Sequence, residues 1–301
     1  MAGEITSIVS QLGVTPEVFL VLVIFAFVAV GAIVVVVVTV PILNLYPYLN
    51  PISRVRARKG RLLTEKQISE LVETADVTEV ENYLSGIQDY SDIADGSSLE
   101  KSLDTKMGET YDMVARIAPK DIASAFKVFS KKSDINNIKS LLAAKEVGLN
   151  QDETSNLLVP TGKLYEDIQR LTDANSVNDI ISGLDNTEYS AVLSDALPDY
   201  EEKKMLLPLD AALDKHYLKT LLGAQEVPGD VNTQILYSYI GNKVDVANIN
   251  LIIRAKADKL DYESVEPYIL NDGYQLREWK LKDLMESEDV SGVVSGLEGT
   301  D

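Results

Sequence analysis

Few residues in this chain could support catalysis or metal binding. It has one histidine, His216, and no cysteine, so it can form neither a thiolate metal site nor a multi-histidine zinc centre. It also lacks a Gly-x-x-x-x-Gly-Lys-Ser/Thr phosphate loop, a Gly-x-Ser-x-Gly elbow and an Asp-rich calcium loop. His216 has no identifiable acid–base partner in the sequence, which favours a surface or partly buried structural histidine. We therefore predict a protein that is not an enzyme and has no cofactor and no metal site.

A polar pattern that occurs twice offers binding chemistry instead. The run DINNIKSLLAAK, from Asp134 to Lys145, returns as DVANINLIIRAK from Asp245 to Lys256, at a constant offset of 111 residues. Its apolar positions have helical spacing, so Ile138 and Ile249 are expected in equivalent core positions. The aspartate that begins each run is placed to cap its helix.

The polar residues of these two helices have two interpretations. Asn137, Asn248, Lys145, Arg254 and Lys256 could line a central socket and contact an acidic or polar partner. The same side chains could instead cap, pair within the helix or lie exposed to solvent. We favour the structural role for the asparagines and leave both roles open for the three basic residues. A threefold ring of charge is not supported, because Ala143 occupies the position of Arg254 in the first run.

A second candidate contact surface is a short basic strip. Its residues are Arg54, Arg56, Arg58, Lys59 and Arg61. The strip could contact anionic headgroups or an acidic protein surface, or it could begin the first solvated helix of a soluble domain.

The strip follows an apolar segment that is long enough to cross a membrane. Residues 18–38 contain no charged or strongly polar side chain and would form about 31 Å of helix. A core helix is disfavoured because no face is polar, and a cleaved signal peptide is disfavoured because no Lys or Arg precedes the run. Pro41 marks the predicted exit. Basic flanks stay in the cytoplasm, so we predict a single-pass protein of the cell membrane, with residues 1–17 outside and the rest on the cytoplasmic side.

The remaining residues indicate an acidic, helical, repetitive domain. The chain has 28 Lys and Arg and 47 Asp and Glu, which gives a net charge of −19. Such a negative charge disfavours nucleic acid as a partner. Thr64-x-x-Gln67 is a capping box, and no stretch alternates with period two. Similar units begin near Gly60, Gly162 and Gly273, as in proteins that repeat one supersecondary unit. The predicted organisation is a membrane helix at 18–40 and helical repeats at 41–130, 131–240 and 241–301, the last lacking counterparts of the helices that follow Thr187.

Three stretches together resemble a known family. They are residues 50–63, the doubled Asp-x-x-Asn-Ile helix, and Leu-Asp-Lys-His-Tyr at 213–217. Over residues 44–301 the chain resembles the central-stalk C subunit of archaeal A-type ATP synthases and is similar to the d subunit of the eukaryotic vacuolar ATPase. The resemblance implies three helical units arranged as a funnel or socket. It also implies two partners: a membrane ring of proteolipid subunits and a rotating shaft formed by the D and F subunits. The segment 18–38 is expected to be an addition to the common pattern.

The function that follows from this resemblance is mechanical. The chain would be a non-catalytic rotor subunit that couples ion flow through the ring, of protons or sodium, to ATP synthesis on other subunits. Residues 18–40 would contact lipid, and no small-molecule substrate is expected. The alternative is a membrane-tethered helical scaffold that binds a soluble partner and has no part in rotation.

Overall fold

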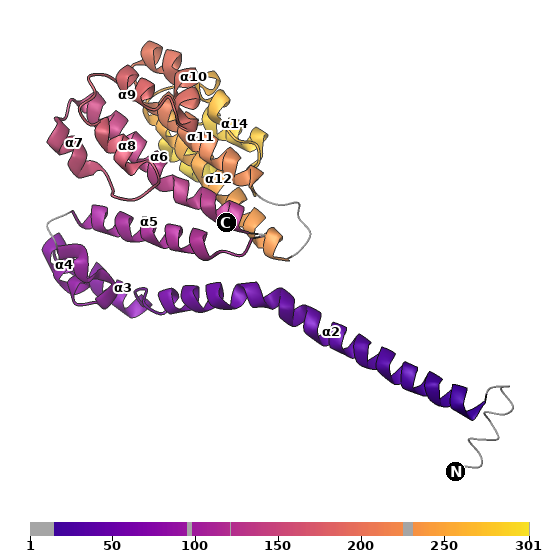
Figure 1. Ribbon diagram of the computed structural model, residues 1–301. Helices are drawn as coiled ribbons and strands as arrows, with labels where there is room; N and C mark the ends of the chain where they lie inside the picture. Colours follow the sequence, from indigo (N-terminus) through magenta and orange to yellow (C-terminus); the bar gives the residue numbers. More distant parts are fainter. Residues whose placement is uncertain (1–14, 95–97, 121, 225–230, 301) are drawn as a thin grey trace. The chain divides into compact units, whose positions relative to one another are not determined.

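The protein is helical throughout the part of the chain that its computed structural model describes, residues 15–94, 98–120, 122–224 and 231–300 (Figure 1). No strand occurs within these residues, so the all-α prediction is confirmed. The first half contains α2 (Pro16–Lys59), α3 (Glu65–Val72), α4 (Val77–Ser85), the 3-10 helix η1 (Gln88–Ala94), α5 (Leu99–Ile117) and α6 (Ala123–Val147). Next come α7 (Gln151–Leu157), α8 (Tyr165–Arg170), α9 (Val177–Gly183), α10 (Glu188–Lys203) and α11 (Leu207–Gly223). The last are α12 (Val231–Ala257), α13 (Tyr262–Val265), the 3-10 helix η2 (Glu266–Tyr268), α14 (Glu278–Glu286) and α15 (Val290–Gly296).

The chain divides into two units, residues 1–57 and 58–301, and α2 supplies most of the described part of the first. We predicted that the chain leaves the membrane at Pro41, and the helix itself is longer than the membrane segment. It continues through Pro41, Pro47 and Pro51 to Lys59. Each proline removes one backbone hydrogen bond, and the bonds of the neighbouring turns keep the helix continuous.

The surface of α2 is apolar and open. Its most hydrophobic window has a mean hydropathy of 3.4, and none of that window is buried inside the protein. Phe25 and Phe27 expose 71% and 76% of their surface. A core helix would have covered these rings. An uncovered apolar helix of this length suggests association with a membrane.

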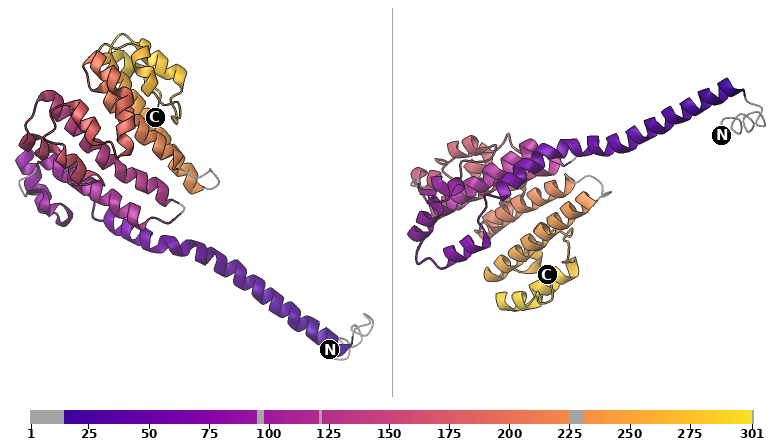
Figure 2. Two further views of the ribbon diagram at one scale, coloured as in Figure 1. Left: turned by 45° about the horizontal axis from the view of Figure 1, so that its top comes forward. Right: turned by 90° about the horizontal axis from the view of Figure 1, so that it is seen from below.

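The second unit is built around α11, which packs against α6, α10 and α12 (Figures 1 and 2). Leu213 and Leu218 of α11 belong to a large apolar core shared with α6, α8, α9 and α10. Leu207 and Ala211, on another face of the same helix, belong to a second core with α12 to α15. One helix therefore joins two cores.

Short helices with polar caps connect these long helices. The predicted capping box is confirmed at α3, where Gln67 N donates to Thr64 Oγ1 (3.3 Å) and Thr64 N donates to Gln67 Oε1 (2.9 Å). Ser176 caps α9 and Asp289 caps α15, each by accepting from a backbone N–H of the first turn. Such caps satisfy backbone N–H groups that the helix itself leaves unpaired.

Candidate functional site

The two asparagines of the repeated pattern are buried and bind a returning loop. Asn137 donates from Nδ2 to the carbonyl oxygens of Val159 (2.9 Å) and Thr161 (3.2 Å), and its Oδ1 accepts from Val159 N (2.9 Å). Asn248 donates from Nδ2 to Leu270 O (2.7 Å), and its Oδ1 accepts from Leu270 N (3.1 Å). Only 1% and 2% of the two residues are exposed. The structural role that we favoured is therefore the observed one.

The two aspartates have a related role, and our prediction that they cap their helices is wrong. Helix α6 begins at Ala123 and α12 at Val231, so Asp134 and Asp245 lie well inside them. Asp134 Oδ1 accepts from Leu164 N (2.8 Å). Asp245 accepts from two consecutive backbone N–H groups that lie 30 and 31 residues further along, at 2.7 and 3.2 Å.

A glycine allows each loop to approach its aspartate. A side chain at Gly162 would collide with Asp134 Oδ1, and one at Gly273 would collide with Asp245 Oδ1. Gly162 also has a φ of +97°, which L-residues with side chains avoid. Burial raises the pKa of Asp134 to about 6, although the hydrogen bond from Leu164 opposes this. The Asp–Asn–Gly arrangement fixes one loop in each repeat, the loop after α7 in the first and the loop after η2 in the second.

Two residues of the basic strip bind other side chains of the protein, and the other three are exposed. Arg58 Nη1 lies 3.0 Å from Asp89 Oδ2, and its Nη2 donates to Thr110 Oγ1 (3.1 Å). Arg61 Nη1 lies 3.2 Å from Asp89 Oδ1. These two arginines thus join the end of α2 and the residues just after it to η1 and α5. Arg54, Arg56 and Lys59 are exposed on α2.

The other predicted contact residues are not gathered at one place. Lys145 and Lys256 lie in the last turns of α6 and α12, where a cation interacts favourably with the helix dipole. Both are partly exposed. Arg254 lines a cavity of about 340 Å³ and binds Asp210 Oδ2 through Nη2 (2.9 Å). Only Arg254 of these three reaches the cavity.

We call that cavity the α12 cleft. It is formed mainly by α11 and α12, with Lys132 of α6, Tyr268 of η2 and Leu270 completing the lining. Its basic lining residues are Lys132, Lys215, Lys243 and Arg254. Our sequence reasoning missed the three lysines, although Lys132 and Lys243 stand at the same 111-residue offset as the paired asparagines.

Asp214 supplies negative charge to the α12 cleft. It lies 3.2 Å from Lys132 Nζ and 2.6 Å from Lys139 Nζ. Burial alone would raise the pKa of Asp214, but the two ammonium groups outweigh it and the net effect lowers that pKa. The cleft therefore contains both positive and negative side chains.

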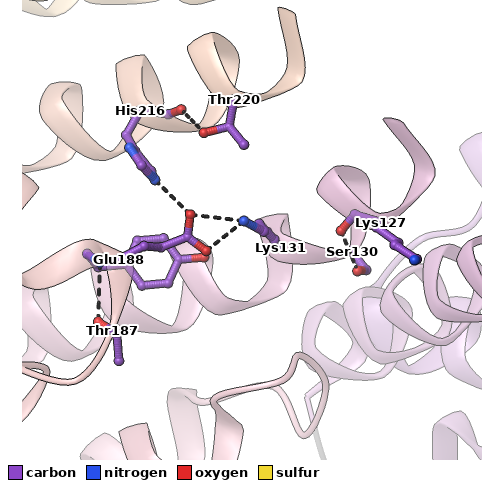
Figure 3. A network of polar contacts seen from close by, with 8 residues as sticks. Lys127, Ser130, Lys131, Thr187, Glu188, His216 and Thr220 are labelled. Atoms are coloured by element: carbon purple, nitrogen blue, oxygen red, sulfur yellow. Dashed lines mark hydrogen bonds and ion pairs between the residues drawn. The ribbon is translucent and has the colours of Figure 1, made fainter. Parts of the chain in front are cut away.

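His216 has an acidic partner that the sequence did not reveal. Figure 3 shows Glu188 of α10 between His216 of α11 and Lys131 of α6. His216 Nε2 lies 3.0 Å from Glu188 Oε2, and Lys131 Nζ donates to Oε1 (2.6 Å) and Oε2 (2.9 Å). The His216 ring meets Tyr189 edge-on. Because Lys131 and His216 both bind the Glu188 carboxylate, Glu188 links α6, α10 and α11. Among the described residues, no group of three His, Asp or Glu side chains could hold a metal ion.

Comparison with known proteins agrees with the resemblance found in the sequence. Residues 51–301 match the family described as ATP synthase (C/AC39) subunit. The chain is 59% identical over 300 residues to the A-type ATP synthase C subunit of Methanobrevibacter smithii, covering 100% of this chain and 78% of that protein. It is 52% identical over 302 residues to the C subunit of Methanothermobacter thermautotrophicus, with the same two coverages. For the C subunit of Methanocaldococcus jannaschii the identity is 34% over 287 residues, covering 93% of this chain and 72% of the relative.

We expected residues 18–38 to be an addition to the common pattern, and the family model does begin after them, at residue 51. Some relatives nevertheless share the segment. The Methanobrevibacter and Methanothermobacter proteins match 100% of this chain, so their matched region includes that segment. It is a shared feature of these relatives.

Proposed function

The chain belongs to the ATP synthase (C/AC39) subunit family, and from this premise we propose that it is a non-catalytic central-stalk rotor subunit of an A-type ATP synthase. That the chain is a subunit of an ATP synthase follows from the family itself. We propose the more specific role of connecting the proteolipid ring in the membrane to the rotating shaft of the D and F subunits.

One observation carries the proposal: a chain that matches these relatives over its whole length combines an uncovered apolar helix with a helical unit. A protein that links a membrane ring to a soluble shaft needs one part for each environment. Transmitting torque requires shape and contact area, and no bond is made or broken. The sequence has no phosphate loop, and the carboxylate that pairs with His216 is also bound by Lys131, which supports a non-catalytic role.

We further infer that the soluble part consists of repeated helical units, two of which start at α6 and α12. The hydrogen bonds of Asn137 and Asn248 reach a backbone N–H 22 residues further along in both cases, which supports this division. The limits that we predicted, at 130/131 and 240/241, cut through α6 and α12. We therefore propose that these two units begin at the first residues of α6 and α12, because each long helix carries the core positions of its unit.

We further propose that residues 18–40 anchor the chain in the membrane. They would cross the membrane once, with the N-terminus outside, and place the rotor subunit on the axis of the ring. Arg54, Arg56 and Lys59 would then lie near the cytoplasmic surface, because they follow the apolar stretch closely along the same helix. Their exposure supports contact with anionic headgroups.

The experiment compares ATP synthase in native membranes with and without this chain. We expect membranes lacking it to retain ATP hydrolysis on the catalytic subunits and to lose ATP-driven ion transport. Restoring the full chain should restore the transport. Ion transport that continues at its normal ratio to hydrolysis without the chain would refute the rotor role and favour the membrane-tethered scaffold.

A further inference from the structure

Helix α2 carries more apolar surface than one crossing of a membrane can use. Residues 18–38 already form about 31 Å of apolar helix, which matches the hydrocarbon thickness of a bilayer. Exposed apolar side chains continue beyond this run, and Ile52 still exposes 43% of its surface. A straight helix from residue 18 to residue 52 would be about 52 Å long. To fit within the bilayer it would have to tilt by about 55°, beyond the roughly 40° that membrane helices reach.

Prolines divide α2 into two arms. Pro41, Pro47 and Pro51 lie inside the helix, and helices bend where proline removes a backbone hydrogen bond. Figures 1 and 2 show α2 bent part of the way along its length. We call residues 18–38 the first arm and residues 42–56 the second arm. The second arm can therefore take a direction different from that of the first.

The second arm is apolar mainly along one side. An apolar stripe runs along it with a spacing of three, four and three residues, formed by Ile42, Leu45, Leu49 and Ile52. All of these side chains are exposed, Leu45 by 61%. The other side of the arm carries Asn44, Asn50 and Arg54. Leu43, which is also apolar, lies at the start of the arm, next to the first arm.

The apolar stripe ends in a basic residue. Arg56 follows Ile52 at the next position of the same spacing, so it lies on the apolar side, whereas Arg54 lies on the polar side. A long arginine side chain can lie along apolar surface and place its charge at the lipid headgroups. Tyr46, at the edge of the stripe, is 72% exposed, and tyrosine rings favour the same depth. An apolar side bordered by such groups is typical of a helix that lies in the plane of a membrane surface.

We propose that the second arm lies on the cytoplasmic surface of the membrane, with the apolar stripe among the lipids and Arg56 against anionic headgroups. Asn44, Asn50 and Arg54 then face water. This refines the headgroup contact proposed above, because it separates Arg56 from Arg54. The inference rests on the proposed membrane anchor, which brings the arm to the surface, and it does not require the ring or the shaft.

The second arm contributes orientation more than affinity. A short apolar stripe with one cation binds a membrane only weakly and reversibly, and an anionic surface repels a chain whose net charge is −19. The anchor keeps the arm close to the surface and so raises its effective concentration there. Removing residues 1–41 would therefore release the chain. In the full chain the arm fixes the direction in which α2 leaves the membrane.

The chain has no cysteine, so single nitroxide labels can be placed on either side of the second arm. The full chain is reconstituted in vesicles of phosphatidylcholine and phosphatidylglycerol. Collisions of each label are measured with oxygen, which enters the bilayer, and with a water-soluble nickel chelate present on both sides of the membrane. Labels at Leu49→Cys and Asn50→Cys form a matched pair, because the two residues are neighbours in the chain on different sides of the helix.

We expect the label at residue 49 to collide with oxygen and to be sheltered from the chelate, and the label at residue 50 to collide with the chelate. Equal access of the chelate to both labels would place the arm in water and overturn the proposal. Equal shelter of both labels in the lipid would extend the membrane-spanning segment through the arm and overturn it too. A label at residue 49 that is sheltered from both reagents would assign the stripe to a protein contact, such as a second copy of the chain, with the same consequence.

A label at Val30→Cys is the control for the anchor. Val30 lies in the first arm and exposes 58% of its surface on the helix, so its label should collide with oxygen and be sheltered from the chelate. A label at this residue that is open to the chelate would refute the anchor itself, and the proposal with it. Shelter at residue 30 together with equal chelate access at residues 49 and 50 would refute the surface arm alone.

Two charge reversals test the role of Arg56, with a label at Ile52→Cys as the reporter. Arg56→Glu puts a carboxylate against anionic headgroups and should shift the balance between bound and free arm about tenfold or more towards the free arm. The chelate should then collide more often with the label. Arg54→Glu, on the polar side of the same helix, is the matched control and should change the collision rate much less. Equal effects of the two reversals, or no effect of Arg56→Glu, would overturn the assignment of Arg56 to the lipid side.

Discussion

Replacing Asn137 by alanine should be among the most destabilising single changes in this protein. The side chain makes three hydrogen bonds to the loop after α7, at 2.9, 3.2 and 2.9 Å, from a position that is 1% exposed. Alanine would leave the N–H and carbonyl of Val159 and the carbonyl of Thr161 without these partners. An unsatisfied buried polar group costs about 1–3 kcal/mol. Allowing for some relaxation of the loop, we expect Asn137→Ala to cost about 3–5 kcal/mol.

The same calculation predicts a smaller effect for the second asparagine. Asn248 makes two hydrogen bonds, both to Leu270, so Asn248→Ala should cost about 2–4 kcal/mol. The two sites share no hydrogen-bond partner, and the double variant should cost the sum to within about 0.5 kcal/mol.

The assay is urea unfolding of the full chain in mild detergent, followed by far-ultraviolet circular dichroism. The matched control is Asn136→Ala, because Asn136 adjoins Asn137 on the same helix but is partly exposed. Alanine there should change the free energy of unfolding by no more than about 0.5 kcal/mol. A cost below about 1 kcal/mol for Asn137→Ala, or a cost equal to that of the control, would show that these hydrogen bonds do not hold the loop and would refute the reasoning.

Three further predictions concern the core, the buried acid and the anchor. Ile138→Ala should cost about 2–5 kcal/mol, and Ile249→Ala clearly less, because Ile138 is fully buried and Ile249 only partly; equal losses in urea unfolding would contradict this. Asp134 has a raised pKa of about 6 in the folded state, so the folded chain holds that proton more tightly, and stability from this group falls as pH rises from about 4 through 6. Asp134→Asn should remove that part of the pH dependence, and an unchanged pH profile of unfolding would contradict the assignment. Deleting residues 1–41 should release a helical product from membranes, and a product that stays membrane-bound without other subunits would refute the proposed anchor.

Local patterns in the sequence predicted several elements, because their causes are local. The apolar stretch of α2 and the capping box at Thr64 depend on residues within a turn or two of each other. The doubled Asp-x-x-Asn run marked two equivalent helices, since identical residues recur in register.

The errors arose where a distant segment decides the outcome. An aspartate before an apolar helical run looks like a cap, and nothing near Asp134 shows that its helix begins at Ala123 or that Leu164 will return to it. The partner of His216, Glu188, lies on another helix. Ile249 was expected to be as buried as Ile138, and it is more exposed because the face of α12 around it is open.

The cleft was the least predictable feature. Its lining comes from α6, α11, α12 and the residues around η2. The repeat relates Lys132 to Lys243, but nothing in the sequence relates Lys215 to either of them. Their convergence depends on how α11 packs between its neighbours, which periodicity alone does not specify.

The central claim, that this chain is a rotor subunit of an A-type ATP synthase, is tested most directly by isolating it from native membranes in mild detergent and identifying what comes with it. The control isolates the chain without residues 1–41 in the same way. We expect the full chain to bring the proteolipid ring, the D and F shaft subunits and the catalytic ATPase subunits in fixed proportion, and the shortened chain to bring less of the ring. A chain that comes alone, or with proteins unrelated to ATP synthesis, would contradict the account.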